Sequence, residues 1–247
     1  MAESLIEQLP KIVAEGKKEV ERIMERLESN NKITLQTNEY VLPIRKEANL
    51  FKGRYQEIDG QNWFNRLCYG DNLLVMQALL NGDESTGLPS MRGMIDLIYI
   101  DPPYDSKADY RTKITLPGCD IEQRPNVLEQ FAYSDTWKDG TVSYLKMMYP
   151  RLYLMKELLS DKGSIYVHLD WHVGHYVKVL MDEIFGKNNL VNEIIWCYKS
   201  GGVGEQGYAK KHDTILMYKK NNEFIFNTPK EKSYMMPWSG KNPAQTY

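Results

Sequence analysis

Strands and helices alternate along most of this chain, and this alternation restricts its fold more than any other feature. In chain order, the pattern predicts a strand over Met94–Ile100, a helix over Val142–Leu159, a buried strand over Gly163–Leu169 and a helix over His172–Phe185 closed by Gly186. Such alternation is typical of a parallel sheet with helices on both faces. We therefore predict an α/β fold.

Further strands are predicted on either side of this series. They are Arg66–Tyr69, Leu190–Cys197, Thr214–Tyr218 and Phe224–Phe226. A helix over Leu73–Leu80, with Asn72 as its N-cap, follows the first of them. No helix separates the last three strands, so we expect that edge of the sheet to be antiparallel. The segment Asp105–Val127 has no clear period and is predicted to be a long loop.

The N-terminal part of the chain has a different pattern. Apolar residues recur at three- and four-residue spacing through residues 2–28, which predicts an amphipathic helix that Pro10 and Gly16 split into two pieces. Its apolar face packs either on its own domain, the interpretation we favour, or on a partner. A polar connector with a strand-like piece at Glu39–Ile44 follows. We expect three regions: a helical appendage with its connector (1–62), a main domain (63–228) and the start of a further region (229–247).

Composition narrows the range of functions. The net charge of the 247 residues is −2, so any nucleic-acid contact must come from local basic clusters. Three widely spaced cysteines form neither a disulfide framework nor a zinc pattern, and no apolar run reaches membrane-spanning length. His168, His172 and His175 have no nearby Cys or Glu at a common ligand spacing. We therefore expect a cytoplasmic protein with no metal site and no membrane contact.

The sequence Asp101-Pro102-Pro103-Tyr104 directly follows the first strand of the main series. Open α/β sheets bind ligands at the carboxyl ends of their strands. The residue types suit one reaction in particular, because an exocyclic adenine amine is a poor nucleophile whose lone pair is delocalised. A carboxylate and a rigidly aimed carbonyl that accept its two N–H groups free that lone pair, and a tyrosine ring stacks on a flipped base. The alternative interpretation is a strand-terminating turn.

Six segments, taken in order, carry a resemblance to a known family. They are Gly70–Leu73, Asp101–Tyr104, Phe131–Trp137, Leu158–Asp170, Asn192–Trp196 and Lys211–Tyr218. The series resembles the DNA amino-methyltransferases of the β arrangement and, more narrowly, the modification (Mod) subunits of Type III restriction–modification systems. This resemblance implies a Rossmann-like methyltransferase sheet, mostly parallel with an antiparallel edge and incomplete in this chain. It also implies S-adenosyl-L-methionine as the methyl donor and a catalytic subdomain over residues 63–228.

The resemblance implies roles for individual residues. Asp101 and the Pro102 carbonyl would hold the amine, with Pro103 keeping the backbone rigid and Tyr104 stacking on the base. Asp71, together with Asp101, would contact the methyl donor, although Gly-Asp-Asn is equally well explained as an N-capped turn. The residues expected to contact DNA are Lys107, Arg111, Lys113, Lys210 and Lys211. A solvated loop of average charge is an equally good interpretation of the first three.

The implied function is methylation of the N6 amine of adenine in double-stranded DNA, on a base flipped from the duplex. A homodimer and a restriction (Res) subunit are the expected partners. Cytosine-N4, RNA or protein amine methylation, and a non-catalytic DNA-binding scaffold, are the alternatives. The family's Phe-x-Gly-x-Gly cofactor motif does not occur in the chain. We therefore expect a fragment of a longer protein, the alternative being that a second chain supplies the rest. This chain alone is expected to bind the donor weakly and to have little or no activity.

Overall fold

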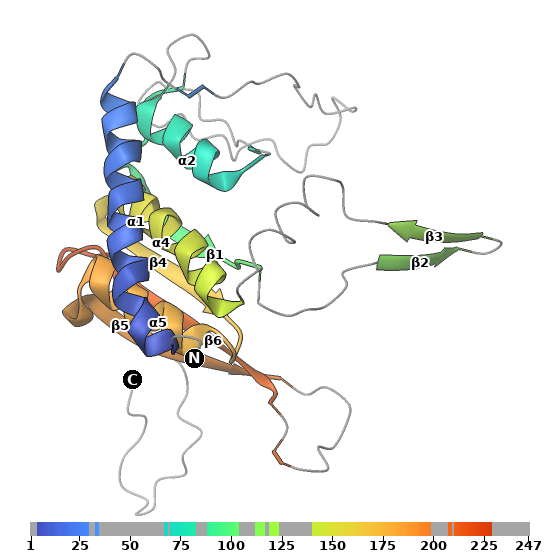
Figure 1. Cartoon of the computed structure of the whole chain (residues 1–247). Helices are drawn as coiled ribbons and strands as arrows, with labels where there is room; N and C mark the ends of the chain where they lie inside the picture. Colours follow the sequence, from blue (N-terminus) through green and yellow to red (C-terminus); the bar gives the residue numbers. More distant parts are fainter. Residues whose placement is uncertain are drawn as a thin grey trace, which may run out of the picture.

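A four-stranded sheet with helices on one face forms the centre of the computed structural model (Figure 1). The structure describes residues 4–29, 33–34, 67–68, 70–82, 88–103, 112–116, 119–123, 140–198, 207–208 and 210–228. The helices are α1 (Leu5–Glu28), α2 (Asn72–Asn81), α4 (Thr141–Leu158), α5 (Gly174–Phe185) and the short 3-10 helix η3 (Lys187–Asn189). The strands are β1 (Ile95–Ile100), β2 (Thr112–Leu116), β3 (Cys119–Gln123), β4 (Leu159–Leu169), β5 (Leu190–Cys197) and β6 (His212–Lys219).

The strand order in the central sheet is β1-β4-β6-β5. β1 pairs with β4 in parallel, whereas β6 is antiparallel to both β4 and β5. Three strands therefore run in the same direction, and only β6 is reversed. The mixed α/β sheet with an antiparallel edge is confirmed. The reversed strand lies one position in from that edge, because β6 is inserted between β4 and β5.

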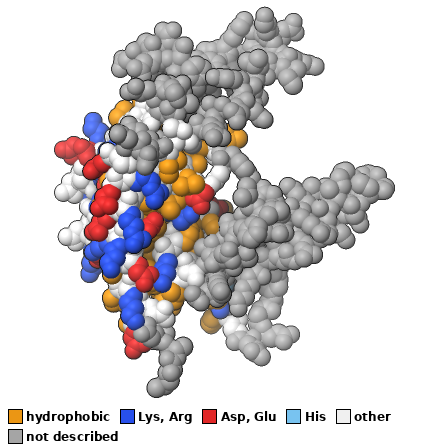
Figure 2. Space-filling view, turned by 45° about the horizontal axis from the view of Figure 1, so that its top comes forward, with side chains coloured by type: hydrophobic (Ala, Val, Ile, Leu, Met, Phe, Trp, Pro, Cys, Tyr) orange, Lys and Arg blue, Asp and Glu red, His pale blue; other side chains and the backbone are white. Residues whose placement is uncertain are grey.

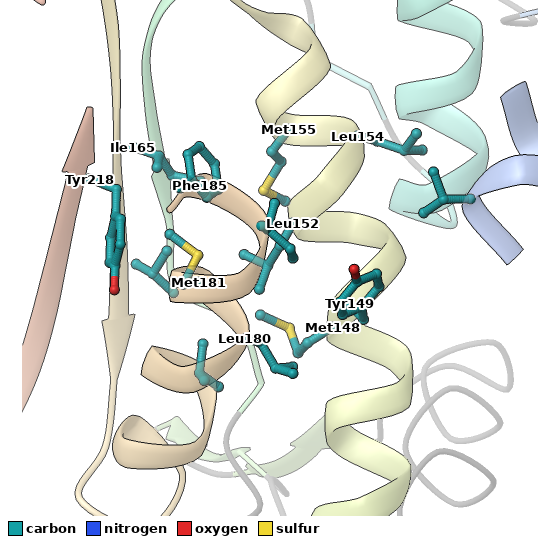
Figure 3. Close-up of a cluster of buried hydrophobic side chains, with 14 of the residues drawn as sticks. Met148, Tyr149, Leu152, Leu154, Met155, Ile165, Leu180, Met181, Phe185 and Tyr218 are labelled. Carbon is teal, nitrogen blue, oxygen red and sulfur yellow. The ribbon is translucent and has the colours of Figure 1, made fainter. Parts of the chain in front are cut away.

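Helices α4 and α5 seal one face of this sheet (Figure 3). Leu152 of α4, Met181 of α5 and Ile165 of β4 are completely buried there. Tyr218 of β6 is also fully buried, and its hydroxyl donates a 2.7 Å hydrogen bond to Oδ1 of Asp182 in α5. Burial and this bond raise the pKa of Tyr218 well above its ordinary value. The layer is therefore closely packed around a buried tyrosine hydroxyl that has a hydrogen-bond partner.

Helix α1 packs on the outer side of α4 (Figure 1). The prediction that Pro10 and Gly16 divide it is wrong, since α1 is continuous and begins with a capping box between Ser4 and Glu7. Gly16 is a packing position, because a Cβ there would lie 2.2 Å from Cδ1 of Tyr149. The side chains that α1 buries are Ile12, Val20, Ile23 and Leu27. Packing of the helix on its own chain is therefore confirmed.

Three further predictions of local structure were wrong. Leu67 and Cys68 have no regular structure, and Leu67 is 98 % exposed, so none of the described strands pairs with these two residues. Residues 224–226 are not a strand, although the Ile225 amide donates one hydrogen bond to the Lys162 carbonyl. The predicted loop 105–127 contains the antiparallel hairpin β2–β3, in which cross-strand pairing satisfies the backbone polar groups.

Several expectations fall on residues that the structure does not describe. These are the strand-like piece at Glu39–Ile44, most of the connector and residues 229–247. The proposed division into three regions therefore stays a prediction. Among the described helices, none combines the length and the apolar character needed to cross a bilayer.

Candidate active site

Asp101, Pro102 and Pro103 follow β1 without an intervening residue. The parallel pairing of β1 with β4 extends to Ile100 opposite Val167 and then stops. Prolines have no N–H to donate to a neighbouring strand, which explains why pairing ends here. The Asp101 side chain is exposed and Pro102 is half-buried. A carboxylate therefore reaches solvent at the carboxyl end of a parallel strand, as the sequence predicts. Tyr104 lies outside the described residues.

A hydrogen-bonded cluster lies at the same end of the sheet. The Tyr99 hydroxyl is 2.8 Å from Nδ1 of His168, and Nε2 of His168 is 3.3 Å from Oδ2 of Asp213. Desolvation, followed by the charge of Asp213 and a hydrogen bond to it, raises the pKa of Tyr198. Tyr198 therefore lies close to the Asp213 carboxylate. These four residues, called the His168 network below, join β1, β4, β6 and the residue after β5.

The surroundings of the His168 network are aromatic and open. The Trp196 ring centroid lies 5.6 Å from that of His168, and the Trp196 and Tyr198 rings meet edge to face at 6.4 Å. Tyr99 and Trp196 are 54 % and 53 % exposed, whereas His168 is only 6 % exposed. A buried polar centre with exposed rings around it can hold planar groups by stacking.

Sequence reasoning missed this network. From the sequence, His168 is considered only as a metal ligand, Tyr99 as part of a strand, and Asp213 only as the residue before the strand Thr214–Tyr218. Tyr99 and His168 are 69 positions apart, and His168 and Asp213 are 45 apart. The available signal was a polar residue near one end of each apolar strand. Tyr99 and His168 lie near the carboxyl ends of β1 and β4, and Asp213 lies near the start of the reversed β6, so all three meet at one edge of the sheet.

Lys210 is one of the predicted DNA-contacting residues, and its ammonium lies over an aromatic ring. Its Nζ is 3.6 Å from the centroid of the Trp171 ring, and this ring stacks on His172 with 3.5 Å between centroids. Asp170, the residue after β4, accepts hydrogen bonds from the His172 amide at 3.0 Å and from its Nδ1 at 2.6 Å. A cation held on a ring near the strand end keeps its charge accessible.

The other predicted DNA-contacting residues are less defined. Lys211 lies just before β6, and its carbonyl accepts a 3.1 Å hydrogen bond from the Tyr198 amide. Lys113 belongs to β2, in register with Glu122 of β3. Lys107 and Arg111 lie outside the described residues. The structure therefore relates only Lys210 and Lys211 to the end of the sheet that carries the His168 network.

Asp71, the predicted donor-contacting residue, is the N-cap of α2, so the prediction that Asn72 caps this helix is wrong. Oδ1 of Asp71 accepts from the amides of Leu73 at 2.8 Å and Leu74 at 3.4 Å. Its carboxylate also lies 3.5 Å from Nη2 of Arg151. Burial lowers the pKa of Arg151, and the charge of Asp71 opposes that effect. Asp71 is thus a structural cap, and its contact with a methyl donor stays a prediction.

The outer helical surface has a different character. Figure 2 shows acidic and basic side chains interspersed there, and specific pairs join Lys17 to Glu183 at 2.7 Å and Lys146 to Glu15 at 2.8 Å. An apolar groove between α1 and α5 opens on this surface, away from the strand ends that carry Asp101. Among the described residues, no three His, Cys, Asp or Glu side chains are grouped to hold a metal ion. This surface carries neither Asp101 nor the His168 network.

Comparisons with known proteins identify the family of this chain. The sequence model of the DNA methylase family matches residues 95–245, a range that begins with β1 and includes Asp101, His168 and Asp213. The chain therefore belongs to the DNA methylase family.

Curated relatives cover most of this chain. The Mod subunit of the Type III restriction–modification enzyme EcoP15I from Escherichia coli is 29 % identical over 187 residues, which are 71 % of this chain and 27 % of the relative. The StyLTI Mod subunit from Salmonella typhimurium is 30 % identical, covering 76 % of this chain and 29 % of the relative. The Type II methyltransferase M.EcaI from Enterobacter cloacae is 31 % identical, covering 68 % and 32 %. The chain thus spans less than a third of the length of these relatives.

Among solved structures, the M1.HpyAVI–SAM complex is similar to this chain. The TM-score is 0.31 at 17 % sequence identity, and the match covers 62 % of this chain and 61 % of the other.

Proposed function

We propose that this protein transfers a methyl group from S-adenosyl-L-methionine to the N6 amine of adenine in DNA, as the modification component of a restriction–modification system. The observation that carries this proposal is the exposed Asp101 carboxylate, followed by two prolines, at the carboxyl end of β1. It lies within the range matched by the DNA methylase family. The relatives named Mod subunits and Type II methyltransferases support the wider setting.

The residues of this chain act on the amine. Asp101 accepts one N–H, the Pro102 carbonyl accepts the other, and the nitrogen becomes more tetrahedral with its lone pair released. Pro103 limits backbone movement, so the two acceptors are positioned before the base arrives. Tyr104 stacks on the flipped adenine. When bound, S-adenosyl-L-methionine supplies the electrophilic methyl group, and the exposed carboxylates of Asp71 and Asp101 suit its polar groups.

DNA binding requires cations near this end of the sheet. Lys210 and Lys211 precede β6, and the Trp171 ring supports the Lys210 ammonium. Such cations contact phosphates, which position the duplex without reading its sequence. Lys107, Arg111 and Lys113 would add to this contact. A homodimer and a Res subunit complete the proposal for the whole protein.

The test is radiolabelled methyl transfer from S-adenosyl-L-methionine to unmodified bacterial DNA, using the full-length protein. Label recovered as N6-methyladenine supports the proposal. Label in N4-methylcytosine, RNA or protein would support methyl transfer but would show that the substrate is not the N6 amine of adenine in DNA. No label on any of them would favour a non-catalytic DNA-binding scaffold.

A pair of matched variants tests the site itself. Asp101→Asn keeps the shape of the side chain but removes the charge, so the rate should fall on the order of 100- to 1,000-fold, as when a charge-stabilising group is lost. Asp161→Asn, at an exposed position early in β4, serves as the control and should methylate normally. DNA binding should persist in both variants. Equal rates in the two would remove Asp101 from the mechanism.

A further inference from the structure

The His168 network has no role in the reaction described above, yet it lies beside the candidate site. Tyr99 precedes Asp101 by two residues, so in an extended strand their side chains point to the same face of the sheet. The pairing of β1 with β4 brings Tyr99 opposite Tyr166 and leaves His168 at the level where Asp101 begins. The network therefore contacts β1 immediately before the catalytic motif.

In the neutral form of His168, its two hydrogen bonds define which ring nitrogen carries the proton. A carboxylate only accepts, so the nitrogen that faces Asp213 at 3.3 Å, Nε2, must be the donor. In the neutral imidazole the other nitrogen, Nδ1, is then an acceptor. The Tyr99 hydroxyl at 2.8 Å must donate to it. Each bond thus determines the direction of the next, from Tyr99 through His168 to Asp213.

Burial makes this arrangement costly to disturb. His168 is 6 % exposed, its side chain and that of Asp213 are 7 % and 19 % exposed, and buried polar groups without partners are strongly destabilising. The Tyr99 ring itself is half exposed, so only its hydroxyl is anchored in the interior. A rigid side chain thus extends from a buried anchor to the open surface beside Asp101.

We propose that Tyr99, His168 and Asp213 form a positioning relay for methyl transfer. Asp213 fixes the tautomer of His168, His168 anchors the Tyr99 hydroxyl, and the anchored Tyr99 holds the end of β1 so that Asp101 meets the amine in a productive geometry. None of the three touches the reacting atoms. This inference rests on the proposed function, because it concerns the placement of Asp101.

The main experiment is a double-mutant cycle on the full-length protein, with kcat and KM measured for DNA and for the methyl donor. Tyr99→Phe keeps the ring and removes the anchor, so kcat should fall about 10- to 100-fold while both KM values stay within about twofold. In Asp213→Asn the tautomer of His168 is no longer fixed, so kcat should fall, but by less than in Tyr99→Phe. In the Tyr99→Phe background, Asp213→Asn should cost nothing more, since the tautomer matters only through Tyr99.

Two controls separate positioning from general damage. Tyr176→Phe and His175→Gln, both in α5 and outside the network, should leave kcat and KM unchanged. His168→Gln should keep part of the activity, because its amide offers one acceptor and one donor, whereas His168→Leu should lose more. If His168→Leu fails to fold, the double-mutant cycle on Tyr99 and Asp213 still tests the relay. Tyr99→Phe removes one oxygen from an exposed residue and is expected to fold.

The tautomer has its own measurement, which does not depend on activity. Nitrogen-15 NMR of the histidine rings, with His168 assigned by its missing signal in His168→Gln, should show a proton on Nε2 and none on Nδ1. A proton on Nδ1, an unchanged kcat in Tyr99→Phe, or losses that multiply in the double variant would each overturn the relay. A wild-type protein that transfers no methyl group would instead refute the proposed function, whatever the NMR result.

Discussion

The two faces of the central sheet are built from alternate residues of the same strands, yet they differ in burial and in polarity. On the face toward α4 and α5, Ile165 of β4 is completely buried (Figure 3), as are Val167 and Leu169. On the opposite face, Leu97 and Tyr99 of β1 are 61 % and 54 % exposed. The polar His168 lies on that second face, between apolar neighbours that point the other way.

The two faces of the sheet therefore have different roles: the face toward α4 and α5 stabilises the fold, and the open face carries the candidate site. The helical side buries apolar groups in close contact, which supplies most of the folding free energy. The open side carries the aromatic rings, the His168 network and the approach to Asp101. Alternation along a strand lets one segment serve both purposes, because a change on one face leaves the other nearly untouched.

The largest expected effect follows from truncating the same residue type on the two faces. Leu152→Ala, at a fully buried position of α4, should lower the free energy of unfolding by about 2–5 kcal/mol. Leu97→Ala, on the open face, should lower it by less than about 1 kcal/mol, since most of that side chain is already in water. Urea denaturation of both variants measures the difference. Similar losses would show that the open face is as closely packed as the helical one.

A second prediction concerns how closely the helices approach on the packed side. In an ordinary helix interior, Gly→Ala stabilises by up to about 1 kcal/mol. Gly16→Ala should have the opposite sign here and destabilise by about 1–3 kcal/mol, because the new methyl group would overlap the buried Tyr149 ring.

Thermal and urea midpoints of Gly16→Ala test this sign. The double variant Gly16→Ala, Tyr149→Leu provides the control, since a smaller side chain in α4 makes room for the methyl group. The two changes together should then cost less than the sum of the single changes. A stabilised Gly16→Ala would mean that α1 does not lie against Tyr149.

Features of the fold and the candidate site that depend on residues close together in the sequence could be predicted, whereas those that depend on contacts between distant segments could not. The bounds of β5 and the place of Asp101 at the end of β1 depend on short patterns of apolar residues and prolines, and both were predicted correctly. The antiparallel pairing at the β5 edge agrees with the absence of a helical pattern in the sequence between Cys197 and Thr214. These are local properties of the chain.

The remaining features depend on contacts between distant segments. Gly16 was interpreted as a helix break because its partner, Tyr149, is 133 positions away and only the packed structure shows why a glycine is needed. The His168 network requires the register of three strands, which periodicity does not supply. The hairpin β2–β3 was missed because its pairing joins two five-residue segments that show no clear period in the sequence.

The smallest expected effect lies at Asp71, where a structural role and a proposed chemical role meet in one side chain. Asp71→Ala removes the cap of α2 and should cost about 1 kcal/mol of stability, whereas Asp71→Asn keeps an equally good capping oxygen and should cost less than half of that. Urea denaturation compares the two. Calorimetric titration with S-adenosyl-L-methionine then separates the roles: if the carboxylate contacts the donor, Asp71→Asn binds it more weakly despite its retained stability. Unchanged binding in Asp71→Asn would leave Asp71 as a helix cap alone, and the polar contacts of the donor would have to come from other residues.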